Sequence, residues 1–135
     1  MKPFRIPILA FVLFVFTWNL ALGQEVDKNL IIGKWKFVKA TIGYYEKDYQ
    51  YNGEPLLTFD NNGRWSTEDS NPNYRQSGTW EIELNNLIRD PDKTEKRDIP
   101  RYARGIEKLT PNELVLSALS EAGLRTFTFY FIKIE

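Results

Sequence analysis

The chain has 135 residues with 18 basic and 18 acidic side chains, and it contains neither histidine nor cysteine. These absences exclude disulfide bonds, Ser-His-Asp and Cys-His catalysis, and metal sites built from imidazole or thiolate ligands. The balanced charge offers no cluster of positive groups for phosphates, so we expect no nucleic-acid partner.

The N-terminal segment has the three parts of a secretion signal. Lys2 and Arg5 form a short basic start, and an almost unbroken apolar run follows over residues 6–22. Ala21 and Gly23 are small residues at the −3 and −1 positions of a cleavage site. The pattern predicts a cleavable signal peptide.

We therefore expect a signal peptide over residues 1–23 and one mature domain over residues 24–135, which would be periplasmic or extracellular. A retained membrane anchor is the alternative, because roughly 17 apolar residues are close to the minimum for spanning a bilayer. After cleavage we expect no stable membrane insertion. A lipid-modified lipoprotein is excluded, since it would need a cysteine at the cleavage site.

The mature domain begins with a predicted helical turn and a long strand. Asp27 is suited to cap a turn over residues 28–31. A strand over residues 33–42 follows, and its apolar phase slips by one residue between Phe37 and Val38. Such a slip predicts a bulge or bend.

The rest of the chain alternates apolar and polar residues in short runs that end in turn residues, and no long window has a helical stripe. Hairpins joining eight strands can close into a barrel, which removes exposed sheet edges. The predicted fold class is therefore all-β, an eight-stranded antiparallel up-and-down barrel with a short N-terminal helical turn. The seven further strands are expected at residues 55–59, 64–67, 78–84, around 87–88, 102–109, 114–119 and 125–134.

Connection lengths predict that the two ends of this barrel differ. In a barrel of successive hairpins, alternate connections lie at alternate ends. One end would therefore be tight, and the other would carry long segments around a mouth. The short connections are residues 60–63, 85–86 and 110–113, and the long ones are residues 43–54, 68–77 and 90–101.

Four tyrosines in the first long connection are candidate ligand-binding residues at the mouth. A phenol has a flat apolar face and a polar tip, which suits sugars, lipid head groups or a protein partner. The alternative is that these rings cover the open end of the core. The four are Tyr44, Tyr45, Tyr49 and Tyr51.

Bulky inward-facing aromatics would form the floor below the mouth. An eight-stranded barrel has room for packed side chains or one small ligand, so this many rings predicts a shallow pocket. Trp65, Trp80 and Phe129 complete the candidate binding site, and Phe59 and Phe127 face the same way.

Carboxylates are the remaining candidates for chemistry. Glu81 and Glu83 lie two residues apart on one strand face, as a paired acid and base would. In an alternating strand this position is more typical of the solvated face. Asp90, Asp92 and Asp98 could bind calcium, but interleaved basic residues favour a solvated loop. We expect no catalytic residue, no metal and no cofactor.

Several segments resemble a known family. Residues 31–35 read Ile-Ile-Gly-Lys-Trp, a Gly-x-Trp at the head of the first strand that resembles the lipocalin signature. Residues 57–63, 78–82 and 106–116 are similar to recurring segments of the small secreted lipocalin-like domains of Bacteroidetes-type bacteria. The resemblance covers nearly the whole mature chain, and it implies the fold more strongly than an activity.

The Gly-x-Trp segment also has a physical interpretation. Glycine lets the backbone pass close to a neighbour, and Trp35 is large enough to plug the narrow end of a barrel. In lipocalins a basic residue late in the last strand packs across this indole. Pairing of the first and last strands would bring Lys133 toward Trp35.

Two non-enzymatic functions are compatible with the sequence. The first is a barrel that binds a small apolar or amphipathic molecule at its mouth. The second is a protein-interaction or structural module of the cell envelope with a filled barrel. A cavity of several hundred Å³ would favour the first, and an enzyme ranks third.

Overall fold

The computed structural model describes residues 26–50, 55–69, 72, 75–95, 97–119 and 126–135. Within these ranges the chain forms one short 3-10 turn and nine strands. The predicted signal peptide, residues 1–23, lies outside them. The elements are η1 (Lys28–Ile31), β1 (Gly33–Ile42), β2 (Lys47–Tyr49), β3 (Leu56–Phe59), β4 (Arg64–Glu68), β5 (Ser77–Glu83), β6 (Asn86–Pro91), β7 (Tyr102–Leu109), β8 (Glu113–Leu119) and β9 (Thr126–Lys133).

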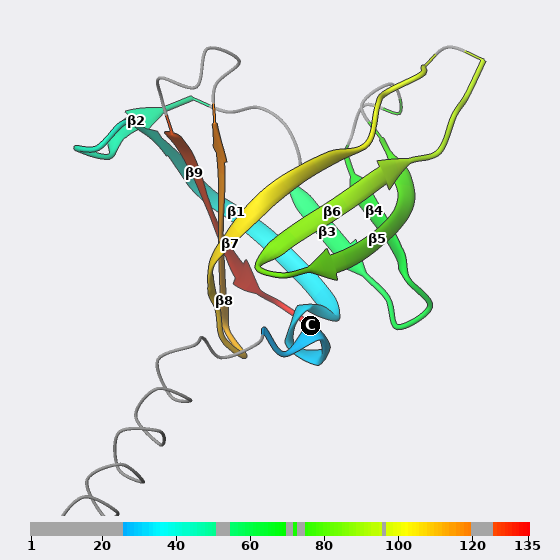
Figure 1. Cartoon of the computed structure of the whole chain (residues 1–135), viewed down its shortest axis with the longest axis horizontal. Helices are drawn as coiled ribbons and strands as arrows, with labels where there is room; N and C mark the ends of the chain where they lie inside the picture. The colour runs from blue at the N-terminus through cyan, green and yellow to red at the C-terminus, as the bar shows by residue number, and fades with distance from the viewer. Residues whose placement is uncertain (1–25, 51–54, 70–71, 73–74, 96, 120–125) are drawn as a thin grey trace, which may run out of the picture.

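The strands form a closed antiparallel barrel (Figure 1). Strands β3 to β9 pair with their neighbours in sequence order, and β1 pairs with both β3 and β9. This closure confirms the predicted eight-stranded up-and-down barrel. The short turns lie near η1 and the C-terminus, and the longer connections lie at the opposite end.

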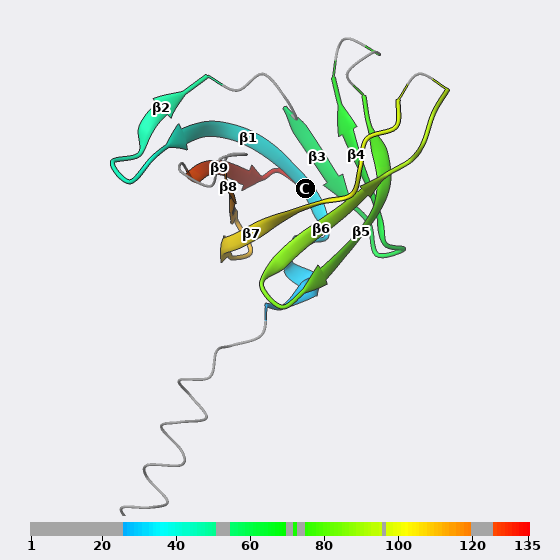
Figure 2. The same cartoon turned by 45° about the horizontal axis from the view of Figure 1, so that its top comes forward.

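Strand β2 is an addition that the sequence did not predict. It lies within residues 43–54, which were expected to be a connection only, and it pairs with the far half of β1. Both views show it beyond the barrel wall, at the end of a hairpin (Figure 2). Three residues that are all exposed carry no apolar alternation, so this strand had no detectable pattern.

The predicted irregularity in β1 is confirmed. The register between β1 and β9 shifts between Phe37 and Lys39. Before the shift Trp35 lies on the inner face, and after it Ala40 does, paired with Phe129. The bulge therefore keeps apolar side chains inside along the whole strand.

Trp35 closes the narrow end of the barrel. Its side chain is fully buried, and its indole Nε1 donates to the carbonyl of Ile31 at 2.7 Å. Asp27 caps η1 by accepting from the backbone N–H of Asn29 at 3.0 Å. The Nζ of Lys133 lies 5.3 Å from the Trp35 ring centroid, which confirms the predicted approach of this lysine.

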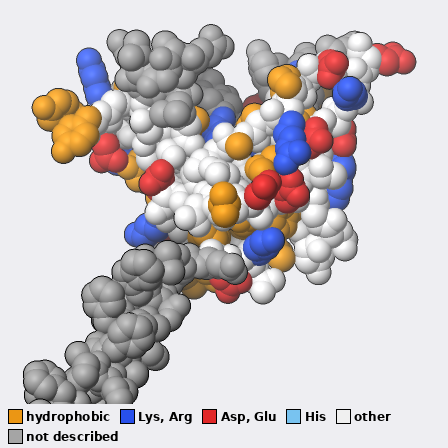
Figure 3. Space-filling model, in the orientation of Figure 1, with side chains coloured by type: hydrophobic (Ala, Val, Ile, Leu, Met, Phe, Trp, Pro, Cys, Tyr) orange, Lys and Arg blue, Asp and Glu red, His pale blue; other side chains and the backbone are white. Residues whose placement is uncertain are grey.

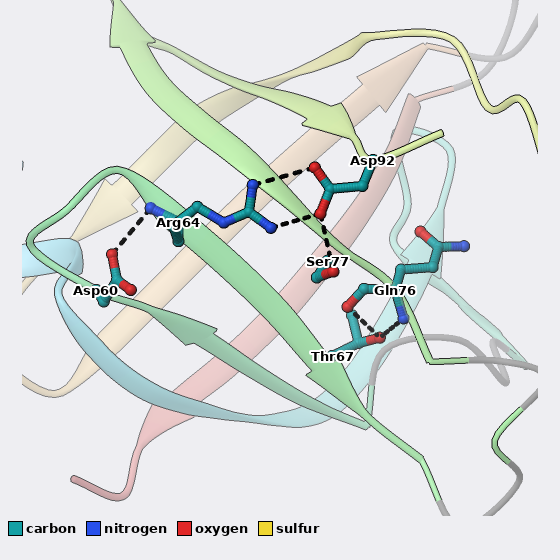
Figure 4. A network of polar contacts seen from close by, with 6 residues as sticks. All are labelled: Asp60, Arg64, Thr67, Gln76, Ser77 and Asp92. Carbon is teal, nitrogen blue, oxygen red and sulfur yellow. Dashed lines mark hydrogen bonds and ion pairs between the residues drawn. The ribbon is translucent and has the colours of Figure 1, made fainter. Parts of the chain in front are cut away.

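A polar network joins the start of β4 to the start of β5 and to Asp92, which follows β6 (Figure 4). Arg64 donates two hydrogen bonds to the Asp92 carboxylate, one of them 3.1 Å long, and Ser77 Oγ donates to the same carboxylate at 3.1 Å. At the hairpin before β4, Asp60 Oδ1 accepts from the backbone N–H groups of Asn62 and Arg64 at 2.9 Å. The predicted turn is therefore fixed by its own aspartate.

The hydrogen bonds from Arg64 hold the pKa of the Asp92 carboxyl below its usual value. Because the folded pKa is the lower one, this stabilisation is complete above the unfolded pKa and is lost as pH falls through the folded pKa. We expect Asp92→Asn to lower the urea midpoint slightly at neutral pH and not at all in strong acid. A deficit that is the same at every pH would contradict this assignment.

Candidate functional site

The barrel interior is packed at its closed end and more accessible at the other. The strand registers place alternate residues inside, and near the closed end they include the fully buried Trp35 and Leu114. At the opposite end Tyr102, Ala118 and Phe127 face inward but remain half-buried. We call these three residues the mouth group. Their partial exposure indicates that solvent reaches the interior at this end.

Below the mouth group a charged side chain lies inside the barrel. Arg89 on β6 is 0% exposed. Its guanidinium carbon is 5.0 Å from the ring centroid of Trp65 and 4.7 Å from that of Tyr102. Cation–π attraction to two rings offsets part of the cost of burying this charge.

A second arginine lies on the same face. Arg104 on β7 is half-buried, and its guanidinium carbon is 4.1 Å from the Phe129 centroid and 5.8 Å from that of Tyr102. Two of the predicted floor residues, Trp65 and Phe129, therefore each contact an arginine in the interior. Both arginines also approach the Tyr102 ring.

Sequence reasoning missed both arginines. The strand around residues 87–88 was predicted to end before Arg89, so its alternation did not show on which face of the sheet Arg89 lies. A signal was present for Arg104, because Tyr102, Arg104 and Ile106 alternate along β7. An arginine in the apolar phase of a strand is uncommon, since charged groups are rarely buried.

The structure separates the predicted tyrosines. Tyr44 and Tyr45 are 94% and 92% exposed, and their ring centroids are 5.4 Å apart. They lie in the turn between β1 and β2, where Figure 3 shows hydrophobic side chains gathered at the tip of the hairpin. Tyr49 packs edge-on against Phe127 with centroids 5.1 Å apart, so it borders the mouth group. Tyr51 lies outside the described residues.

Trp80 lies toward the closed end rather than at the mouth. Its Nε1 donates to the Asp60 carbonyl at 3.2 Å, and its ring is 5.8 Å from that of Phe59. These contacts anchor the hairpin at residues 60–63. Trp80 therefore faces inward, as expected, but it is not brought together with Tyr49.

An open hollow lies beside the mouth. It has a volume of ≈ 730 Å³ at the long-connection ends of β3 and β4. Arg75 lines it, and its Nε donates to the backbone carbonyl of Asp69 at 2.8 Å. The hollow is lined by Pro55, Leu56, Glu68, Asp69 and Arg75.

The candidate carboxylates lie on the outside of the barrel. Glu81 and Glu83 are exposed, and Glu81 accepts from the Arg101 guanidinium at 2.5 Å. Asp92 is held by Arg64, as described above. Over the ranges that the structure covers, no group of three or more acidic, histidine or cysteine side chains could hold a metal ion. This arrangement favours the solvated interpretation of these residues.

No helix in the described part of the chain has the length and apolar character needed to cross a membrane. The face seen in Figure 3 carries acidic and basic side chains side by side over β5 to β7 rather than a patch of one sign.

Comparisons with known proteins agree on the fold. A family model for the lipocalin-like domain matches residues 31–116. A lipocalin-like protein from Bacteroides uniformis is 14% identical with a TM-score of 0.55, and the match covers 78% of this chain and 99% of that chain. An uncharacterized protein from Bacteroides eggerthii is also 14% identical with a TM-score of 0.55, over 77% of this chain and 99% of that one.

A more distant match is a bovine odorant-binding protein in complex with a selenium-containing odorant. It is 18% identical with a TM-score of 0.44, over 84% of this chain and 77% of that chain. No curated protein matches the sequence significantly.

Proposed function

Since this chain belongs to the lipocalin-like domain family, we propose that it is a non-enzymatic barrel that binds a small apolar or amphipathic molecule at its open end. The observation that carries this proposal is the mouth group. Its side chains face inward, are apolar or aromatic, and keep part of their surface accessible. When an apolar molecule covers the partly exposed apolar surface of such an interior, the free energy of the system falls, which favours binding.

A neutral fluorescent probe tests this function directly. We expect N-phenyl-1-naphthylamine to bind with enhanced emission, and Ala118→Trp to weaken that binding about tenfold, because a large ring would fill the mouth. Ala103→Trp is the matched control, since Ala103 lies on the exposed outer face of the adjacent strand. Equal probe binding by all three proteins would contradict the proposal, and so would no binding by any of them.

A second candidate function is contact with another protein of the cell envelope. The observation that favours it is the pair Tyr44 and Tyr45, exposed together at the hairpin tip. Exposed paired aromatics are typical of interaction surfaces. We expect Tyr44→Ser with Tyr45→Ser to change the free energy of unfolding by less than about 0.5 kcal/mol, because neither ring is buried.

Tyr49 separates the two functions. Because its ring packs on Phe127 at the mouth, Tyr49→Ser should weaken probe binding, whereas the double change at the hairpin tip should not. If the tip variant loses the probe and Tyr49→Ser keeps it, the binding site lies on the hairpin and not in the barrel. Probe titration and thermal melting of the two variants give the answer.

We also propose that the protein is exported and cleaved between Gly23 and Gln24. Ala21 and Gly23 are the small pair correctly placed after the apolar run. Intact-mass measurement of the exported protein should therefore give a chain that begins at Gln24. A mass that includes the apolar segment would identify a retained anchor.

A further inference from the structure

Two arginines lie in the interior beneath the mouth. Arg89 and Arg104 both lie on the inner face, and both approach the ring of Tyr102. Asp69 lies just past the end of β4, at a position where the alternation of that strand places it on the same inner face near the mouth. It is the acidic residue among the described ones at such positions. Among the described side chains of this inner face, two guanidinium groups therefore lie with one carboxylate.

Hydrogen-bond donors also gather there. A guanidinium carries five N–H donors in a planar fork that fits a carboxylate. Trp65 is 1% exposed, and its indole Nε1 has no hydrogen-bond acceptor among the residues that the structure describes. Its ring lies 5.0 Å from the Arg89 guanidinium carbon.

The two arginines differ in access. Arg89 is fully buried behind Trp65 and Tyr102, whereas Arg104 is half-buried and lies against Phe129. A molecule that enters past Ala118 and Phe127 would therefore meet Arg104 first. Arg89 would not touch the molecule but would attract a negative group through its charge, because electrostatic interactions are weakly screened in the interior.

We infer that the ligand is an amphipathic carboxylate, an apolar body with one acidic head. This inference rests on the proposed ligand-binding function and names the chemical class that the same site takes. The head contacts the Arg104 guanidinium, and the apolar body packs against Phe127 and Ala118. A buried positive site lowers the free energy of a carboxylate relative to a neutral head of similar size.

The test compares two ligands that share a tail. Octanoate and 1-octanol are titrated against protein loaded with N-phenyl-1-naphthylamine, and displacement of the neutral probe gives both affinities. For the wild-type protein we expect octanoate to bind at least about tenfold more tightly than octanol. Arg104→Gln should bring the two affinities to within about threefold by weakening octanoate alone.

Two further variants keep the result interpretable. Arg101→Gln is the matched control, because Arg101 lies on the outer surface in an ion pair with Glu81 and should preserve the preference. Arg104→Lys keeps the charge without the planar fork, so it should retain part of the preference and covers the case in which Arg104→Gln does not fold.

Equal affinities for octanoate and octanol in the wild-type protein would overturn the inference, while binding of the neutral probe would leave the proposed function standing. A preference that Arg104→Gln and Arg101→Gln reduce equally would also overturn it, because it would then arise from surface charge. If the wild-type protein binds neither the probe nor the two ligands, the proposed function itself fails.

Discussion

Replacing Trp35 with alanine should lower the free energy of unfolding by about 3–5 kcal/mol, the range for removing a large buried aromatic side chain. The indole is 0% exposed and closes the narrow end of the barrel. The change also removes the hydrogen bond to the Ile31 carbonyl, which is 2.7 Å long, and the ring beneath Lys133. Chemical denaturation of the mature protein measures the loss.

Two other substitutions make this result specific. Trp35→Phe keeps an aromatic ring but not the N–H, so it should lose less stability than the alanine variant. Val38→Ala changes the same strand at a side chain that is 52% exposed, and we expect a change within about 0.5 kcal/mol. A Trp35→Ala midpoint equal to that of the wild-type protein would show that the indole is not part of the core.

Gly33→Ala should be the second severe change, with a loss of about 3 kcal/mol from backbone strain and overpacking together. Gly33 has a φ of +136°, and a Cβ there would lie 2.3 Å from the backbone oxygen of Glu135. That oxygen accepts from the Lys34 N–H at 2.9 Å, so it cannot move away without breaking the junction between the chain's first and last strands.

Gly43→Ala separates the two causes. Gly43 also has a positive φ, +82°, but a Cβ there would have no atom within 4 Å. We expect only the conformational cost of about 1–2 kcal/mol. If the two variants unfold at the same denaturant concentration, close packing against Glu135 contributes nothing.

Much of the barrel could be predicted because its strands alternate. The helical turn, the long first strand and the bulge after Phe37 are all as expected. Exposed segments have no such pattern, which explains why β2 was missed. The strand around residues 87–88 was predicted too short for a different reason. The inner face of β6 carries Arg89 and Pro91 after Leu87, and an arginine at such a position interrupts the apolar alternation by which a strand is recognised.

The candidate site was harder to predict than the fold. Four tyrosines close in sequence suggested one cluster, but Tyr44 and Tyr45 are almost fully exposed and contact each other, whereas Tyr49 packs on Phe127. The two arginines show the reverse case. Arg89 and Arg104 are far apart in sequence, and the pairing of β6 with β7 brings them together. Proximity of that kind depends on register across strands, and a single strand's pattern does not contain it.

The pairing of β1 with β9 has a consequence for the time at which the barrel can form. Strands β3 to β9 each pair with a strand that precedes them in the sequence, but one edge of β1 has no partner until β9 pairs with it. Contacts between segments far apart in sequence form slowly, because a long loop must close first. We expect the barrel to remain open until β9 has formed, and the pairing of β1 with β9 to be the slowest step of folding.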